Sequence, residues 1–200
     1  MTDKRVLTIQ DISCFGQCSL TVALPIISAC GIETAVIPSA VLSTHTSGFT
    51  GFTVHDLAED IPKIHAHWKE VGVKFNAIYT GYLGTPEMIA DVISIMNDLG
   101  TDDSLNIVDP AMADGGVLYP AFDMTYVEEM KKLCAKADII LPNITEACML
   151  TGMEYKEEYD EAYIDELLAK LKALGAEMIV LTGVGYKPGR TGVVVFGNGE

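Results

Sequence analysis

The sequence has few basic residues. Its 13 Lys and Arg stand against 28 Asp and Glu, which gives a formal net charge of -15 at pH 7. The basic residues are scattered along the chain, whereas nucleic acids and anionic membrane surfaces are bound through clusters of Lys and Arg. We therefore expect no nucleic-acid or membrane partner, and an anionic substrate would need local positive groups or a metal ion.

Long apolar runs are also missing. No stretch reaches the length that spans a membrane. The start of the chain, residues 1–5, leads directly into a short strand-like run and does not resemble a secretory leader. These features predict a cytoplasmic protein.

The sequence has few cysteines, and their spacing does not indicate disulfide pairs. The five, an odd number without Cys-x-x-Cys spacing, are Cys14, Cys18, Cys30, Cys134 and Cys148. This pattern favours reduced thiols over a disulfide framework. A zinc site made of Cys14, Cys18, His65 and His67 is disfavoured, because no second ligand pair has the spacing of a zinc finger.

Two familiar phosphate-binding motifs are absent. The loop after the first predicted strand, residues 10–19, contains only Gly16, which argues against a dinucleotide-dependent oxidoreductase. The turn at 182–187 contains two glycines but lacks the Gly-Lys-Ser/Thr ending of a P-loop. Its backbone N–H groups and the Thr182 hydroxyl still offer contacts to a phosphate.

What the chain does have is an alternation of strands and helices. Its 200 residues and 49% hydrophobic content predict one domain with a sizeable core. Strands are predicted at 6–9, 34–37, 40–43, 75–79, 104–108, 139–141, 178–181 and 193–196. Helices are predicted at 20–30, 56–71, 85–100, 123–135 and 163–174, with another opening at 143. This order indicates an α/β fold with a mainly parallel central sheet and helices on both faces.

Two acids follow the strand predicted at 104–108. Asp109 comes at its carboxyl end, where ligands bind in open α/β sheets, and Asp114 follows on a loop that Gly115 and Gly116 are expected to keep mobile. Such a pair suits a hydrated Mg²⁺. The alternative is structural: Asp109 caps a turn and Asp114 begins an Asp-Gly turn.

The helix start at 143 has two interpretations as well. Asn143 with Glu146 three residues later is typical of a capping box. Both residues also follow the carboxyl end of a predicted strand, so the Glu146 carboxylate can serve a metal-bound water at the same time.

Two aromatic loops suggest a small ring-shaped ligand. The stretch at 44–52 carries hydroxyls, an imidazole and two phenylalanines, and is expected either to close over a ligand or to form a solvated surface hairpin. Tyr82, between two glycines at a strand end, is expected either to stack on a ring or to fill the loop.

Taken together, these pieces resemble the ribokinase superfamily, and most closely the pyridoxal (vitamin B6) kinases. The matching pieces are Ile9-Gln10, Ser43-Thr44-His45-Thr46, Gly81-Tyr82-Leu83-Gly84, the run from Asp109 to Asp114, Pro142-Asn143-Ile144-Thr145-Glu146 and Leu181-Thr182-Gly183. The resemblance implies a three-layer sandwich and the ATP-dependent, Mg²⁺-assisted phosphorylation of the 5'-hydroxymethyl group of pyridoxal, pyridoxine or pyridoxamine. It also implies a homodimer.

The resemblance also implies roles for individual residues. The ATP phosphates would be organised by Asp109, Asn143, Glu146 and Thr182, and Mg²⁺ by Asp114 and Glu146. The vitamin pocket would be lined by Asp11, His45, Thr46, Ser47 and Tyr82. The segment 39–52 would act as a substrate lid.

The chain departs from the family pattern in two places. Position 11 is Asp, where Ser is usual, and this predicts a preference for an amine-bearing vitamer. The Gly-x-Gly-Asp loop that carries the family's catalytic base is missing, and Gly197-Asn198-Gly199-Glu200 is predicted to be a hairpin turn instead. We therefore expect the base to lie beyond Glu200, in an absent C-terminal third, and residues 1–200 to turn over poorly by themselves.

Two alternatives stay open. A hydroxymethylpyrimidine kinase shares the fold and the chemistry implied by the resemblance. The second alternative is a noncatalytic domain that binds a nucleotide or a vitamin. The absence of the catalytic Gly-x-Gly-Asp loop favours it.

Overall fold

The computed structural model describes residues 4–187 and 189–197. Its backbone contacts divide the chain into two compact units, Met1–Asn106 and Ile107–Glu200, and the strand β5, Gly100–Val108, begins in the first and ends in the second. Whether the units form one domain stays a prediction. The turn predicted at the end of the chain falls largely on residues 198–200, outside the described residues.

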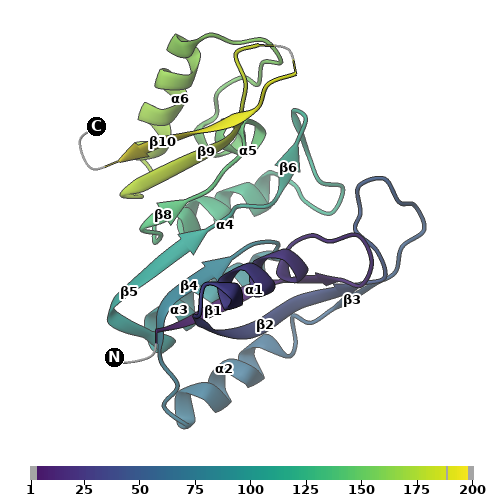
Figure 1. Cartoon of the computed structure of the whole chain (residues 1–200), viewed down its shortest axis with the longest axis vertical. Coiled ribbons are helices and arrows are strands. Elements are labelled where there is room, and N and C mark those ends of the chain that lie inside the picture. Colours follow the sequence, from purple (N-terminus) through teal and green to yellow (C-terminus); the bar gives the residue numbers. More distant parts are fainter. Residues whose placement is uncertain (1–3, 188, 198–200) are drawn as a thin grey trace. The chain divides into compact units, whose positions relative to one another are not determined.

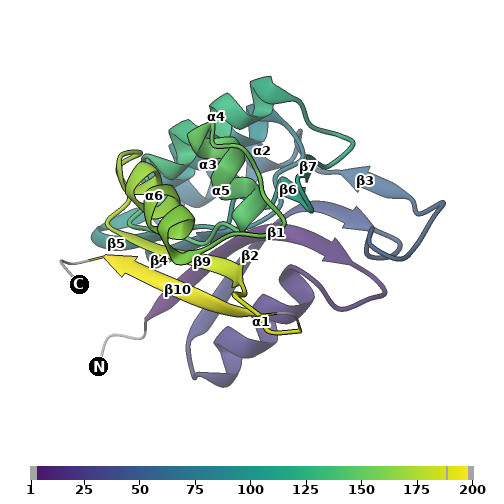
Figure 2. The same cartoon turned by 90° about the horizontal axis from the view of Figure 1, so that it is seen from above.

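The first unit is a parallel sheet with one antiparallel edge. Its elements are β1 (Arg5–Ser13), α1 (Leu20–Ala29), β2 (Glu33–Leu42), β3 (Val54–Asp56), α2 (Ile61–Glu70), β4 (Phe75–Thr80) and α3 (Pro86–Leu99). The strand order is β4-β1-β2-β3; β1 runs parallel to β2 and β4, and only β3 is antiparallel (Figure 1). Helix α1 covers one face, and α2 and α3 cover the other (Figure 2). This unit has the three layers that the sequence predicts.

The core of the first unit follows from the position of β1 between two parallel neighbours. Leu7, Thr8 and Ile9 are completely buried, since a central parallel strand is covered on both faces. Helix α3 begins as its sequence predicts, with the Thr85 hydroxyl accepting a hydrogen bond from the Met88 N–H (3.2 Å) and Pro86 in the first turn.

Two boundaries predicted in the first unit are wrong. Pro38 does not separate two strands: β2 runs through it, and the ladder with β1 shifts its register next to the Gln10–Pro38 pair, where the missing proline N–H is tolerated. The helix predicted from residue 56 begins at Ile61, because Asp56 ends β3 and its carboxylate accepts a hydrogen bond from the Ala58 N–H (2.7 Å). That local turn competes with a helix start.

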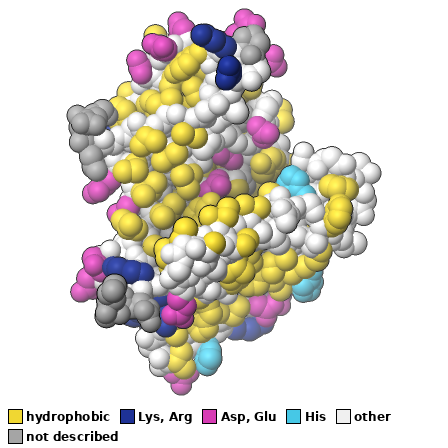
Figure 3. All heavy atoms as spheres, viewed as in Figure 1, with side chains coloured by type: hydrophobic (Ala, Val, Ile, Leu, Met, Phe, Trp, Pro, Cys, Tyr) yellow, Lys and Arg dark blue, Asp and Glu magenta, His cyan; other side chains and the backbone are white. Residues whose placement is uncertain are grey.

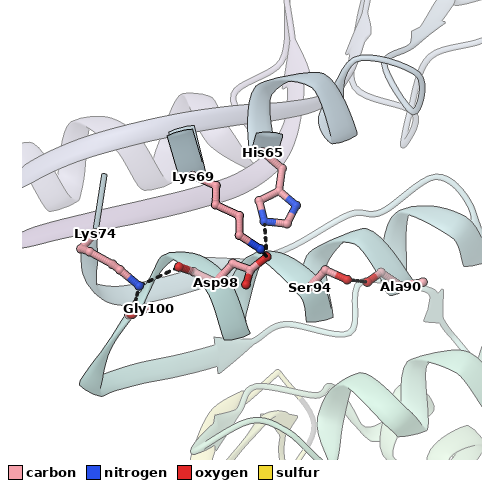
Figure 4. A network of polar contacts seen from close by, with 7 residues as sticks. All are labelled: His65, Lys69, Lys74, Ala90, Ser94, Asp98 and Gly100. Atoms are coloured by element: carbon pink, nitrogen blue, oxygen red, sulfur yellow. Dashed lines mark hydrogen bonds and ion pairs between the residues drawn. The ribbon is translucent and has the colours of Figure 1, made fainter. Parts of the chain in front are cut away.

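Helices α2 and α3 are joined by a polar network (Figure 4). The Asp98 carboxylate contacts Lys69 Nζ (2.7 Å) and His65 Nε2 (3.1 Å), and the hydrogen bond from Lys69 lowers the pKa of Asp98. Lys74 Nζ donates to the carbonyls of Asp98 (2.7 Å) and Gly100 (3.2 Å), at the end of α3. A cation at a helix C-terminus complements its unpaired carbonyls. His65, which belonged to the disfavoured zinc site, therefore holds two helices together.

The second unit continues the parallel pattern and ends on an antiparallel strand. After β5 come β6 (Ala113–Asp114), β7 (Val117–Leu118), α4 (Met124–Cys134), β8 (Ile139–Ile140), α5 (Ile144–Thr151), α6 (Glu161–Lys172), β9 (Met178–Val184) and β10 (Gly192–Gly197). The order is β5-β8-β9-β10, with β8 parallel to β5 and β9 and β10 antiparallel to β9. The three helices lie on the same face of these strands (Figure 2). The predicted α/β class with mainly parallel strands is confirmed.

The structure bears on two further expectations. None of the helices within residues 4–187 and 189–197 has the length and apolar character needed to cross a bilayer. All five cysteines are free thiols, of which Cys134 and Cys148 are buried.

Candidate functional site

The predicted site residues fall into two groups, one in each unit. The residues assigned to ATP and Mg²⁺ all belong to the second unit: Asp109, Asp114, Asn143, Glu146 and Thr182. Those assigned to the vitamin all belong to the first unit: Asp11, His45, Thr46, Ser47 and Tyr82.

The start of α5 is a complete capping box. Asn143 Oδ1 accepts a hydrogen bond from the Glu146 N–H (2.9 Å), and Glu146 Oε2 accepts one from the Asn143 N–H (2.8 Å). The Asn143 side-chain amide also donates to the Ala113 carbonyl (2.8 Å). The capping box predicted from the sequence is confirmed, and it is tied to the loop that follows β5.

Glu146 is the centre of this group. Its side chain is only 2% exposed, and its second oxygen, Oε1, accepts a hydrogen bond from the Met112 N–H (3.0 Å). Both carboxylate oxygens therefore bind backbone donors, one on its own helix and one on the acidic loop. Each oxygen retains lone-pair capacity for a further donor or a cation.

The partly exposed Asp109 and the buried Glu146 are two acids whose charges interact. Burial raises the pKa of Asp109 to about 6, while a hydrogen bond from the Ala111 N–H to its Oδ1 (3.2 Å) acts in the opposite direction. Burial and, next, the negative charge of Asp109 together raise the pKa of Glu146 to about 7, against the hydrogen bonds from backbone N–H groups, which lower it. A bound cation stabilises the charged forms of two carboxyl groups that are poorly hydrated and repel each other.

Asp114 lies on a hairpin rather than on the mobile loop expected from the sequence. Strands β6 and β7 pair through Ala113–Leu118 and Asp114–Val117, with Gly115 and Gly116 at positive φ in the turn. The Gly116 N–H donates to the Thr145 hydroxyl (3.0 Å), which fastens the hairpin to α5. Asp114 is exposed, and its Oδ1 accepts a hydrogen bond from the Gly115 N–H (2.8 Å). The Asp-Gly turn of the alternative interpretation is present.

Thr182 lies next to Asn143. Its N–H donates to the Pro142 carbonyl (2.9 Å), and its hydroxyl lies 3.4 Å from the same oxygen. Strand β9 continues to Val184, three residues beyond the predicted end at 181, because β10 pairs with it over that length. Asn143, Glu146 and Thr182 are thus brought together, as predicted.

In the first unit, Asp11 and Tyr82 lie close to each other. Asp11 is the last of five consecutive buried residues in β1, is 5% exposed, and accepts a hydrogen bond from the Ser13 hydroxyl (3.3 Å). Burial raises the pKa of Tyr82, and the charges of Asp11 and Asp56 raise it further. A carboxylate, a phenol and a second carboxylate therefore share one neighbourhood.

Two residues of this neighbourhood were missed by the sequence analysis. The buried Ser39 hydroxyl donates to the Tyr82 carbonyl (2.6 Å). Asp56 comes so close to Gly84 that a Cβ there would lie 3.0 Å from Asp56 Oδ2. Nothing local in the sequence indicates either contact, since Ser39 and Tyr82 are 43 residues apart.

The segment 44–52 is the loop between the antiparallel strands β2 and β3. Its exposed tip stands out at the side of the first unit, with hydrophobic atoms at its surface (Figures 1 and 3). The His45 N–H donates to the Phe15 carbonyl (2.8 Å), and the rings of Phe15 and Phe49 pack edge to face, 5.8 Å apart. Thr46 and Ser47 are exposed. This is the geometry of the hairpin alternative, and a lid role stays a prediction.

The fit of a magnesium ion was tested on the acids of the second unit. Within the described residues, no three side chains of His, Cys, Asp or Glu are arranged to hold a metal by themselves. Mg²⁺ bound to a nucleotide takes only one or two carboxylates, together with water and phosphate oxygens. The Asp109–Glu146 pair, in which burial is the main cause that raises both pKa values, fits such an ion.

Comparison with known proteins finds similarity over nearly the whole chain. The family model "Phosphomethylpyrimidine kinase" matches residues 23–197. A crystal structure from Bacteroides thetaiotaomicron, provisionally named a phosphomethylpyrimidine kinase and containing pyridoxal, is 40% identical, with a TM-score of 0.93 over 98% of this chain and 69% of that one. Pyridoxal kinase from Leishmania donovani, in complex with ADP and pyridoxamine, is 25% identical, with a TM-score of 0.82 over 99% of this chain and 74% of that one.

Curated relatives are longer than this chain. Pyridoxal kinase from Dictyostelium discoideum is 24% identical over 205 residues, which cover 98% of this chain and 65% of that protein. The chain thus spans somewhat less than two thirds of the length of this relative.

Proposed function

Because the chain belongs to the pyridoxal kinase and phosphomethylpyrimidine kinase family of the ribokinase superfamily, we propose that it provides the vitamin-binding and nucleotide-binding parts of a B6 vitamer kinase. The reaction is the ATP-dependent phosphorylation of the 5'-hydroxymethyl group of pyridoxal, pyridoxine or pyridoxamine. The observation that carries the proposal is the Asp109–Glu146 pair, held against the capped start of α5.

The second unit supplies the proposed nucleotide site. Asn143 and Thr182 present an amide and a hydroxyl beside each other, and phosphate oxygens accept hydrogen bonds from both kinds of group. Asp114 and Glu146 hold Mg²⁺ and its waters, and Asp109 organises the nucleotide phosphates through that ion, since its own carboxylate repels them. When bound, Mg²⁺ neutralises the charge that develops on the transferred phosphoryl group.

The first unit supplies the proposed vitamer site. Tyr82 offers an aromatic face and Asp11 a buried carboxylate, while His45, Thr46 and Ser47 lie on the loop proposed to act as a lid. Pockets for small rings combine apolar surface with a few placed polar groups. The bound pyridoxal and pyridoxamine of the two structural relatives support this choice of substrate.

An ATP-consumption assay with the three B6 vitamers and hydroxymethylpyrimidine tests the proposal. It is run on residues 1–200 and on the polypeptide extended to the next stop codon of its gene. We expect the extended chain to phosphorylate a B6 vitamer and residues 1–200 to turn over poorly. Full activity of residues 1–200 would refute the predicted dependence on a further segment, and no turnover of any substrate by either chain would refute the kinase assignment.

Asp11→Ser is expected to change vitamer preference. The Asp11 carboxylate is buried, so an ammonium group that reaches it gains more than it would at an exposed acid. We expect the ratio of kcat/KM for pyridoxamine to that for pyridoxal to fall about tenfold in the extended chain, equivalent to ~1.4 kcal/mol. The exposed acid Glu33, mutated to Ser, is the control. An unchanged ratio in Asp11→Ser would refute the role of Asp11 in specificity.

Hydroxymethylpyrimidine phosphorylation is the second candidate function. It is favoured by the similarity to hydroxymethylpyrimidine/phosphomethylpyrimidine kinase from Bacillus subtilis, which is 27% identical over 92% of this chain and 58% of that protein. The four-substrate assay separates the two candidates directly. If ATP and a vitamer bind but the extended chain does not turn over, the noncatalytic alternative replaces both.

A further inference from the structure

The connection between α5 and α6 carries a tyrosine that reaches the turn after Thr182. The Tyr159 hydroxyl accepts a hydrogen bond from the Gly185 N–H (2.9 Å) and lies 3.5 Å from the Gly183 carbonyl, in the geometry of a donor to it. Tyr159 and Gly185 are 26 residues apart. One side chain therefore bonds both ends of the Gly183-Val184-Gly185 backbone.

That backbone has a shape that other residues do not readily adopt. Gly183 has a φ of +75°, and a Cβ at Gly185 would clash with the Arg190 carbonyl oxygen. Gly183 and Val184 belong to β9, whose register with β10 shifts between the pairs Thr182–Val193 and Val184–Gly192, and Gly185 comes directly after this strand. The partly buried Gly185 N–H needs a hydrogen-bond partner. Tyr159 supplies it.

Tyr159 is itself held in place by its neighbours. Its ring stacks on Tyr163 (5.9 Å between centroids) and meets the edge of Tyr186 (6.1 Å). The Tyr163 hydroxyl donates to the Glu154 carbonyl (2.7 Å), which fastens the connection to α6. The packed aromatic rings therefore restrict the rotamers of Tyr159 and hold its hydroxyl in position.

We propose that Tyr159 is a positioning residue for the nucleotide-phosphate site at Thr182. It fixes the bulged end of β9 that follows Thr182 and the start of the turn at Gly185, so that the Thr182 hydroxyl and the adjoining backbone are set for phosphate before the nucleotide arrives. This inference rests on the proposed nucleotide site. Tyr159 acts through the turn and makes no contact with the reacting atoms.

The test compares Tyr159→Phe with Tyr155→Phe, which removes a phenol hydroxyl from the same connection, at a ring that lies beside Gly116 rather than beside the turn. Amide hydrogen exchange at Gly185 is measured by NMR, and the Kd values for ATP and pyridoxal by calorimetry, all on the intact chain. For Tyr159→Phe we expect faster exchange at Gly185, a three- to tenfold rise in the Kd for ATP and no change for pyridoxal, as the loss of about one hydrogen bond implies. Tyr155→Phe is expected to leave exchange at Gly185 unchanged.

Each other result has a distinct meaning. Unchanged exchange at Gly185 in Tyr159→Phe overturns the inference, because the turn then does not depend on the phenol. Faster exchange with an unchanged ATP Kd, or with an equal loss of pyridoxal binding, overturns the positioning role. If the wild-type chain binds no ATP, the proposed nucleotide site fails, and that failure is recognised without either variant.

Discussion

Asp109→Asn is expected to make the ligand-free protein more stable at neutral pH while it weakens Mg²⁺-dependent nucleotide binding. In the folded protein the charged Asp109 carboxylate loses much of its hydration and is repelled by Glu146, and both effects lower the free energy of unfolding. Asparagine keeps an oxygen that can accept the hydrogen bond from the Ala111 N–H and carries no charge.

The pH dependence follows from the direction of the shift. The pKa of Asp109 rises from 3.8 to about 6 on folding, so between these values the folded protein binds the proton more tightly than the unfolded chain. The free energy of unfolding then falls as the pH rises through this window. The stabilisation by Asp109→Asn is accordingly present above about pH 6 and disappears below about pH 4.

The pKa shift of Asp109 sets an upper limit on the gain in stability of Asp109→Asn. A shift from 3.8 to about 6 corresponds to roughly 3 kcal/mol at 1.36 kcal/mol per unit, which partial exposure of the side chain reduces to about 1–2 kcal/mol. We expect a rise in Tm of about 3–6 °C at neutral pH. For Mg·ATP we expect a rise in Kd of about tenfold or more, equivalent to ~1.4 kcal/mol.

Calorimetry at several pH values, with and without MgCl2, measures these effects. Asp123→Asn is the matched control, since Asp123 is an exposed N-cap of α4 and asparagine caps equally well. Mg·ATP is expected to raise the Tm of the wild type and of the control, and to raise that of Asp109→Asn much less. A lower Tm for Asp109→Asn at neutral pH would show that the carboxylate is stabilising, contrary to the argument.

The parts of the structure that the sequence predicted are those with local signals. The start of α3 follows from Thr85 and Pro86, and the start of α5 from Asn143 and Glu146, because the capping partners lie within three residues of each other. The strand ends that precede Asp109 and Tyr82 were also predicted from a local signal, because an apolar run bounded by turn residues is visible within a few residues of sequence.

Apart from the start of α2, where the local hydrogen bond between Asp56 and Ala58 decides, the predictions that failed concern features with distant partners. The continuation of β2 through Pro38 depends on its register with β1, and the β6–β7 hairpin on the hydrogen bond between Gly116 and Thr145, 29 residues apart. The same holds for Tyr159, whose partner is Gly185. Sequence periodicity carries no information on which distant residue will meet a given hydroxyl.

Glu146→Ala is expected to produce the largest loss of stability of any substitution in the candidate site. The Met112 and Asn143 N–H groups lose their acceptor together, and an unsatisfied buried donor costs about 1–3 kcal/mol. Relief of the repulsion with Asp109 offsets part of this at neutral pH, so we expect a net loss of about 2–4 kcal/mol in the free energy of unfolding. Urea unfolding measures it, and Glu161→Ala, at an exposed acid in the first turn of α6, should change stability by less than about 0.5 kcal/mol.

Glu146→Gln separates the capping role from the proposed metal role. Glutamine retains one carbonyl oxygen for one of the two N–H groups, so we expect it to lose about half as much stability as Glu146→Ala, and to fold. It carries no charge, so Mg²⁺ should no longer strengthen ATP binding in this variant as it does in the wild type. If Mg²⁺ strengthens ATP binding equally in both, Glu146 acts only as the cap that fastens the acidic loop to α5, and Mg²⁺ is held by other groups.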